Sequence, residues 1–273
     1  MKKIAFIILG FIFVLGTVAV VGRLLTGEDS WICQNGQWVK HGNPSAPKPQ
    51  TPCGNAKKQT LPLPTPTNPV PTPTTITPAQ KFINLDIPFT SQAPFGDWAD
   101  PRQQDGCEEA ASLMAVYWTQ GKSLNPQEAL KGILNISAYE EENFGDYHDT
   151  NTEDTVKRII KGYFGYQKAE ARKNITLQNI ISEIMLGNAV IVPLNGQVNG
   201  NPYYTAPGPE RHNLVIRGYD PKTREFITND NGTRHGENYR YSQDVLFASI
   251  RDYPTGDHVP IIKIEKSMIV VKK

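Results

Sequence analysis

The sequence has little cysteine, little histidine and almost no net charge. Its 273 residues include three cysteines and five histidines, and 28 basic residues balance 27 acidic ones to a net charge of +1. The cysteines stand at positions 33, 53 and 107, without the paired Cys-x-x-Cys spacing of zinc sites. We therefore expect no metal, no cofactor and no nucleic-acid partner.

One long uncharged apolar run is present, from Ile4 to Val21, directly after Lys2 and Lys3. Its length suits a membrane crossing, and it lacks a small-x-small cleavage site, so residues 1–24 predict a transmembrane signal anchor. The positive-inside rule keeps the two lysines in the cytoplasm. We expect a single-pass protein that is anchored in the membrane through residues 4–21. The rest of the chain is then extracytoplasmic, or secreted if the leader is cleaved.

Residues 25–54 predict a small hairpin, because an Asn-Gly turn at 35–36 is flanked by tryptophans. A two-stranded hairpin alone is marginal in water. In an exported chain, a disulfide between Cys33 and Cys53 is expected to stabilise this hairpin, although the sequence leaves open whether it forms. Cys107 would then be the odd thiol.

Residues 55–80 are rich in proline and threonine, centred on the run Leu61-Pro62-Leu63-Pro64. This composition cannot bury a core and favours extended polyproline II. The segment is therefore predicted to be a semi-rigid linker, followed by a globular domain over residues 81–273.

In the globular domain, helical patterns come before most strand patterns. Helices are expected from Cys107, from Asn125 to about Leu134, from Thr152 to Phe164 and from Thr176 to Leu186. Thr152 and Thr176 are the expected caps of the last two helices, and an exposed acidic loop is expected at 140–149. Strands are expected at 83–89, 189–194, 214–219, 225–228, 260–264 and 268–271. This order is typical of an α+β fold, with N-terminal helices packed on a C-terminal antiparallel sheet.

Cys107 is the first candidate functional residue, because it stands on the first turn of a predicted apolar helix. The helix N-terminus favours negative charge, which lowers a thiol pKa and favours the nucleophilic thiolate. Glu108 and Glu109 oppose that ionisation. A buried structural cysteine is the alternative interpretation.

A base and its orienting group follow from the predicted strand pairing. His212 opens a strand, and after the turn at 220–224 the next strand runs back towards Asn229 and Asp230. The pairing sets His212 opposite about residue 231, so we expect His212 and Asp230 to lie side by side. Asn229 remains an alternative to Asp230, and His235 an alternative to His212.

Acyl chemistry at a cysteine also needs a donor for the developing oxyanion, often a side-chain amide. Gln92 and Gln104 are the candidates. We prefer Gln92, which follows a predicted strand and has a long loop to reach the site, over Gln104, which is very close to Cys107 in sequence.

Together these segments resemble the bacterial peptidase C39-like family. The resemblance covers about residues 83–253 and is carried by Ile87-Pro88-Phe89-x-x-Gln92, Gly106-Cys107-Glu108, the strand from His212 to Asp220, and Asn229-Asp230-x-Gly232-Thr233. It implies a papain-like fold in which Cys107, His212 and Asp230 form the catalytic triad and Gln92 completes the oxyanion hole.

The function expected from this resemblance is a cysteine peptidase acting on a peptide or protein substrate. The same residues would also suit a cell-wall amidase or transpeptidase, and a stalked binding module without catalysis is the third alternative. The sequence leaves the cleavage specificity and the oligomeric state open.

Overall fold

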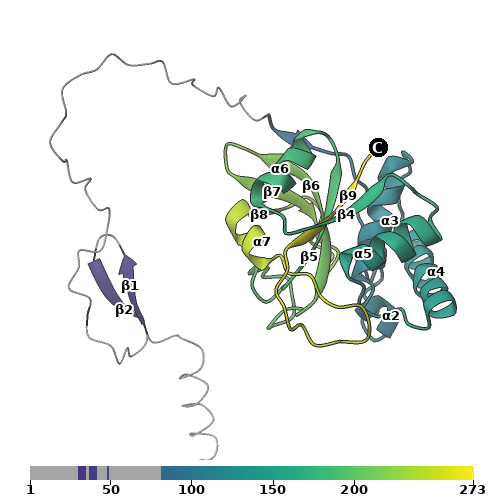
Figure 1. Ribbon diagram of the computed structural model, residues 1–273, viewed down its shortest axis with the longest axis horizontal. Coiled ribbons are helices and arrows are strands. Elements are labelled where there is room, and N and C mark those ends of the chain that lie inside the picture. Colours follow the sequence, from purple (N-terminus) through teal and green to yellow (C-terminus); the bar gives the residue numbers. More distant parts are fainter. Residues whose placement is uncertain (1–29, 35–36, 42–47, 49–80) are drawn as a thin grey trace, which may run out of the picture. The chain divides into compact units, whose positions relative to one another are not determined.

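The computed structural model describes residues 30–34, 37–41, 48 and 81–273, and the chain divides into two units, Met1–Thr74 and Thr75–Lys273 (Figure 1). In the first unit, β1 (Ser30–Gln34) pairs antiparallel with β2 (Gln37–His41), which confirms the predicted hairpin. The expected anchor, the Pro/Thr-rich linker and Cys53 with its expected disulfide lie outside the described residues. No helix in the described part of the chain is long and apolar enough to span a membrane.

The second unit is built on a seven-stranded antiparallel sheet. The strand order is β4-β9-β5-β6-β7-β8, and β3 pairs with β6. The strands are β3 (Ile83–Asn84), β4 (Ala169–Lys173), β5 (Ala189–Leu194), β6 (His212–Asp220), β7 (Glu225–Asn229), β8 (Tyr239–Ser242) and β9 (Ser267–Val271).

Helices cover both faces of this sheet (Figure 1). They are α2 (Pro101–Gln104), α3 (Cys107–Thr119), α4 (Pro126–Phe144), α5 (Thr152–Asp154), the π-helix η1 (Thr155–Tyr163), α6 (Leu177–Met185) and α7 (Gln243–Ser249). α3 and η1 pack on one face, with α4 behind them, and α6 and α7 pack on the other. This arrangement confirms the predicted α+β class.

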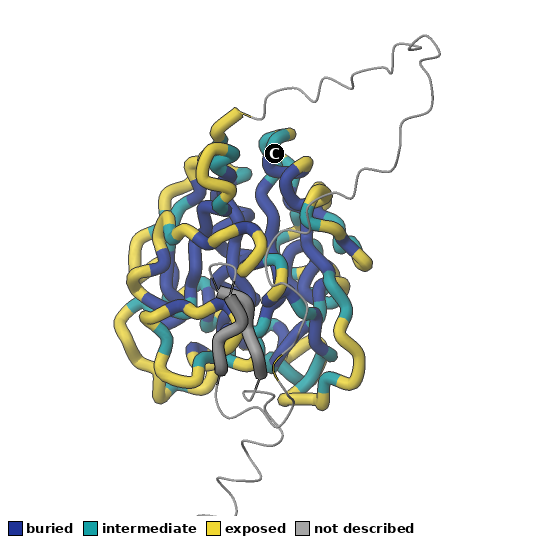
Figure 2. Tube along the Cα trace, turned by 90° about the vertical axis from the view of Figure 1, so that its left-hand side faces the viewer, coloured by how far each residue is buried: buried dark blue, intermediate teal, exposed yellow. Residues whose placement is uncertain are grey.

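Strand β5 shows why the sheet centre is apolar throughout. All six of its residues are buried. Val190 and Val192 pack in the cluster on the α6 side, whereas Ala189 and Ile191 pack in the cluster on the α3 side. A strand covered on both faces needs apolar residues at every position. In Figure 2 the buried segments accordingly run through the middle of the domain.

The exposed acidic loop predicted at 140–149 is partly wrong, because its first residues belong to a helix. Helix α4 continues past Leu134 to Phe144 and ends at Gly145, which has a left-handed φ of 74°. The helical face of Ala129, Ile133 and Ile136 extends to Glu140, which is buried. Acidic composition suggested exposure, but the helical spacing places Glu140 on the buried face.

Other local predictions also need correction. Residues 260–264 form an irregular segment instead of a strand, and Ile262 is 96% exposed there. The cap of α5 is Asn151, whose side chain accepts from the N–H of Asp154, and the predicted cap Thr152 is the first helical residue. The short elements α2, β4, β8 and α7 were missed, while Thr176 caps α6 as predicted.

The buried Glu140 predicts an unusual pH dependence of stability. Both of its carboxylate oxygens are buried without a hydrogen-bond partner, and burial, with the charge of Glu108, raises its pKa to about 8. The unfolded chain loses this proton near pH 4.3, so stability falls as the pH rises from there to about 8. We expect Glu140→Gln to stabilise the protein at pH 8 by on the order of 1–3 kcal/mol, and by little at pH 5.

Urea unfolding at the two pH values measures this difference. Glu142→Gln is the matched control, because Glu142 lies on the same helix and is exposed. Equal shifts for the two variants at pH 8 would contradict the prediction.

Candidate active site

Cys107 is positioned by the close approach of two helices. Helix α2 ends at Gln104, and Gly106 is the N-cap of α3. A Cβ atom on Gly106 would lie 2.6 Å from the carbonyl oxygen of Arg102, so only glycine fits between the helices. Cys107 therefore begins α3 as predicted, and its side chain lines a cavity while remaining 5% exposed.

His212 and Asp230 lie together at the ends of β6 and β7. The Nε2 atom of His212 is 2.8 Å from Oδ1 of Asp230. The register differs slightly from the prediction: Val215 lies opposite Asn229, one position further along, and a bulge follows between Ile216 and Gly218. The two side chains still meet, because Asp230 directly follows the end of β7.

Asp230 is held as an ionised carboxylate by several donors. Besides His212, its oxygens accept hydrogen bonds from four groups: Tyr204 Oη and Tyr241 Oη at 2.6 Å each, Asn201 Nδ2 at 3.0 Å and the Gly232 N–H at 3.1 Å. Burial opposes ionisation, but His212 and the two hydroxyls outweigh it and lower the pKa of Asp230. An ionised carboxylate only accepts, so the donating nitrogen of His212 is Nε2.

Gly232 leaves room for the imidazole. A Cβ atom at this position would lie 2.9 Å from Cε1 of His212 and 3.0 Å from a ring carbon of Tyr204. Any side chain at position 232 would displace the His212 ring, which gives a physical reason for a glycine two residues after Asp230.

Asn229 and His235, the alternatives to Asp230 and His212, have other partners. Asn229 donates to the carbonyls of Ile87 and Pro88 and accepts from Arg217, so it does not contact the imidazole. The ring of His235 stacks on Tyr203, with centroids 4.6 Å apart. The structure thus pairs His212 with Asp230, and their catalytic roles stay predictions.

Asn231 was not identified from the sequence, and it contacts the segments of both Cys107 and Gln92. Its Nδ2 donates to the carbonyl of Cys107 at 2.8 Å, and its own carbonyl accepts from the N–H of Gln92 at 2.9 Å. Tyr204, Tyr241 and Asn201 were also missed. Nothing in their local sequence distinguishes these polar residues, since they matter through contacts between distant segments.

The Gln92 side chain is buried and lines the same cavity as Cys107. Its Nε2 donates to the carbonyls of Gln103 and Gln104, at 3.0 and 2.8 Å, and its Oε1 is buried without a partner. Both amide hydrogens are therefore engaged. Gln104 also lines the cavity and is exposed.

The thiol of Cys107 has a raised pKa, in contrast to the lowering expected from the helix N-terminus alone. Burial is the main cause, and the neighbouring carboxylate of Glu108 adds to it. The carboxylates of Asp149 and Glu109 also raise this pKa, each by less than Glu108. The expected opposition from the two acidic residues thus comes chiefly from Glu108.

The cavity has a volume of about 1550 Å³, and predicted residues from three separate segments line it. Its lining includes Gln92, Cys107 and His212, with Phe95, Trp98 and Tyr203 as exposed aromatic side chains. Within the described residues, no group of three or more His, Cys, Asp or Glu side chains could hold a metal ion. The arrangement suits nucleophilic acyl chemistry at a thiol.

Comparison with known proteins agrees with the motifs. The model of the Peptidase_C39 like family matches residues 84–253, more than half of the chain. The chain belongs to this family. The C39-like match extends from β3 to Tyr253 and so includes Gln92, Cys107, His212 and Asp230.

Two solved structures are similar to this C39-like chain. One is described as a C39-like peptidase from Bacillus anthracis; it is 13% identical, the match covers 71% of this chain and 98% of that one, and the TM-score is 0.40. The other is xylellain, a cysteine protease from Xylella fastidiosa, with 12% identity, 70% and 85% coverage and a TM-score of 0.35. No match was found among the curated proteins.

Proposed function

We propose that this protein is a membrane-tethered, extracytoplasmic cysteine peptidase that uses Cys107, His212 and Asp230. One observation carries the proposal: His212, whose Nε2 lies 2.8 Å from Oδ1 of Asp230, lines the same cavity as a cysteine at a helix N-terminus in a C39-like domain. The tether rests on the apolar run at 4–21 and the Pro/Thr-rich linker that follows it.

In the proposed reaction, Sγ of Cys107 attacks the carbonyl carbon of a peptide bond, and its proton passes to Nδ1 of His212. Asp230 holds Nε2 and stabilises the imidazolium that forms. The imidazolium then protonates the leaving amine as the C–N bond breaks. Water, with His212 as the base, hydrolyses the thioester and releases Cys107.

The oxyanion is assigned to the backbone N–H of Cys107 and the side chain of Gln92. Cys107 is the first residue of α3, and the first N–H groups of a helix have no partner within it. Gln92 would exchange one of its bonds, to the carbonyl of Gln103 or Gln104, for the oxyanion. Gln104 remains the alternative donor.

The volume and the aromatic lining of the cavity support an extended substrate. Its volume of about 1550 Å³ exceeds that of ordinary small-molecule pockets, which measure roughly 300–1,000 Å³. Phe95, Trp98 and Tyr203 expose aromatic surface along it, suited to substrate side chains. A polypeptide segment fits these features.

The proposal is tested by incubating the full chain with a peptide library and, separately, with purified peptidoglycan. We expect cleavage of library peptides by the wild type and loss of cleavage in His212→Ala. A thiol-directed peptide probe should also label Cys107 strongly in the wild type and weakly in this variant.

The other outcomes assign other functions. Release of wall fragments with intact library peptides would indicate a cell-wall amidase. Equal labelling of wild type and His212→Ala, without cleavage of either substrate, would indicate a binding module and contradict the proposed peptidase.

A further inference from the structure

The thiol of Cys107 is directed to a carboxylate and not to the histidine. Its Sγ donates a hydrogen bond to Oε2 of Glu108, the next residue in the chain, at 2.9 Å. Within residues 81–273, no hydrogen bond joins Sγ to the His212 ring, although both line the same cavity. The mechanism above does not use Glu108, so this contact needs its own explanation.

The Glu108 carboxylate is almost completely buried, with 2% of the residue exposed, and is surrounded by donors. Besides the thiol, its Oε1 accepts from the hydroxyl of Tyr253 at 2.6 Å and from the N–H of Thr150 at 3.2 Å. Burial raises the pKa of Glu108, and the hydrogen bonds from the Cys107 thiol, Tyr253 and Thr150 oppose that rise by favouring the ionised form. Three donors and no acceptor are the partners that suit an ionised carboxylate. A buried carboxylate is stable only when it is satisfied in this way.

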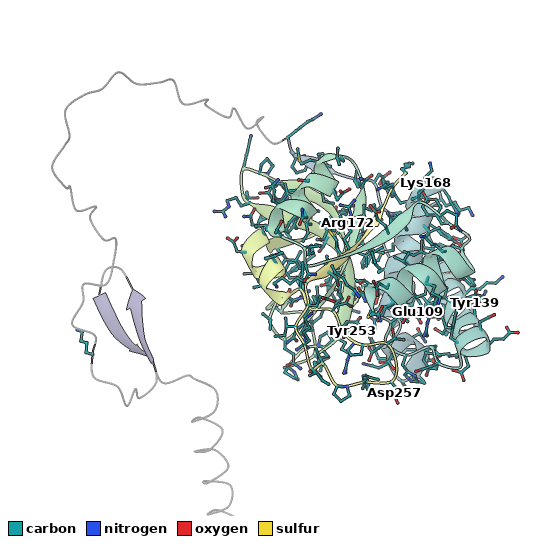
Figure 3. The ribbon with its side chains drawn as sticks, in the orientation of Figure 1. Glu109, Tyr139, Lys168, Arg172, Tyr253 and Asp257 are labelled. Atoms are coloured by element: carbon teal, nitrogen blue, oxygen red, sulfur yellow. The ribbon has the colours of Figure 1, made fainter. Side chains whose placement is uncertain are left out.

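Tyr253 connects this carboxylate to the strand that carries the histidine. Its hydroxyl accepts from Nδ2 of Asn213, the residue after His212, at 2.6 Å, and lies 3.8 Å from Sγ of Cys107. Tyr253 is itself buried. In Figure 3, where Tyr253 and Glu109 are labelled, Tyr253 lies in the lower half of the domain. One hydroxyl thus contacts groups beside both members of the proposed nucleophile and base pair.

We propose that Glu108, fixed by Tyr253, is a positioning residue that holds Cys107 before substrate binding as a neutral thiol, and not as a thiolate paired with His212. The inference rests on the proposed function. Catalysis then requires the thiol to leave Glu108: the S–H bond breaks, its proton passes to Nδ1 of His212, and the sulfur electron pair forms the S–C bond to the substrate carbonyl. The peptidase would be activated by the substrate that fills its cavity.

The neighbouring carboxylates of Glu109 and Asp149 also favour the neutral thiol over the thiolate. On α3, Glu109 faces Ser137, and Glu140 of α4 interacts with both acidic residues. Asp149 precedes Thr150 and pairs with Arg211 and His258, at 3.3 and 3.2 Å. Across the cavity lies the His212–Asp230 pair. Among residues 81–273, Glu108 is the one carboxylate in hydrogen-bond contact with Sγ.

The test is the pH dependence of alkylation of Cys107 by iodoacetamide in the full chain, followed by mass spectrometry of the peptide that contains Cys107. Glu108→Gln replaces the anion by an amide that can donate to a thiolate. We expect the alkylation midpoint to fall by at least about one pH unit, so that the rate at pH 7 rises about tenfold. Glu109→Gln is the matched control, with an expected change below about twofold.

Circular dichroism and thermal melting show whether Glu108→Gln folds. If it does not, Tyr253→Phe provides a second test. In Tyr253→Phe, Glu108 loses a donor, takes up a proton more readily and opposes the thiolate less. We expect its midpoint to fall, by less than in Glu108→Gln. An unchanged or raised midpoint in the folded variants, or an equal fall in Glu109→Gln, would overturn the proposal.

The readout is independent of turnover. If Cys107→Ala retained peptide cleavage, the proposed function would fail while the shift in alkylation could still be observed. If the shift were absent while His212→Ala and Cys107→Ala lost cleavage, only the positioning role of Glu108 would fail.

Discussion

Replacing Cys107 by alanine lowers kcat/KM for peptide hydrolysis by the full chain on the order of 10⁴-fold or more, because no other group in the cavity can form the thioester. The loss should appear with any cleavable library peptide. It is measured as the initial rate of hydrolysis of a fluorogenic peptide at several substrate concentrations.

Folding should persist with a loss of stability on the order of 1–3 kcal/mol. Alanine fits the helix start, but it leaves the buried Oε2 atom of Glu108 without the thiol that donates to it. The matched control is Ser112→Ala, which removes a buried hydroxyl without a partner from the same helix. We expect Ser112→Ala to retain activity. Retained hydrolysis in Cys107→Ala would show that the nucleophile lies elsewhere.

Replacing Asp230 by alanine should impair both folding and activity. The side chain is fully buried and joins His212 to two tyrosine hydroxyls. Its removal leaves these donors unsatisfied, and breaking such a buried pair costs about 3–5 kcal/mol of unfolding free energy. Without an orienting group for the imidazole, we also expect kcat to fall roughly 10³-fold or more. Urea unfolding and peptide hydrolysis measure the two effects.

Asp230→Asn separates the two roles. The asparagine oxygen can still accept from Nε2 of His212, so activity should recover in part relative to alanine, while the hydroxyls of Tyr204 and Tyr241 lose an ionised partner. Because the folded-state pKa of Asp230 is lowered, its contribution to stability is present above about pH 4 and is lost as the pH falls through the folded pKa. Asp230→Asn should lack this acid-dependent loss, and equal activity of the alanine and asparagine variants would contradict the orienting role.

The site was predictable from the sequence to the extent that it depended on strand ends and helix starts. Cys107 begins α3 directly after its N-cap Gly106, and His212 opens a strand whose partner ends just before Asp230. The bulge after Ile216 moved the register by one residue without separating the pair. Pairing at a strand end tolerates such a shift, because Asp230 lies beyond the paired residues.

What could not be predicted depends on contacts between distant segments. Tyr253 reaches Glu108 across 145 positions, and Asn231 reaches the carbonyl of Cys107 across 124. Neither residue has a local pattern that distinguishes it from surface polar residues. The same reason applies to Glu140, which was expected in an exposed loop: its burial depends on how α4 packs against α3 and η1.

The proposed covalent mechanism is tested most directly by intact-mass spectrometry after rapid mixing of the full chain with an activated peptide ester. The mechanism predicts a transient mass increase of one acyl group, mapped to Cys107 and absent in Cys107→Ala. Steady product formation with Cys107 unmodified, or an acyl group mapped to another residue, would contradict it.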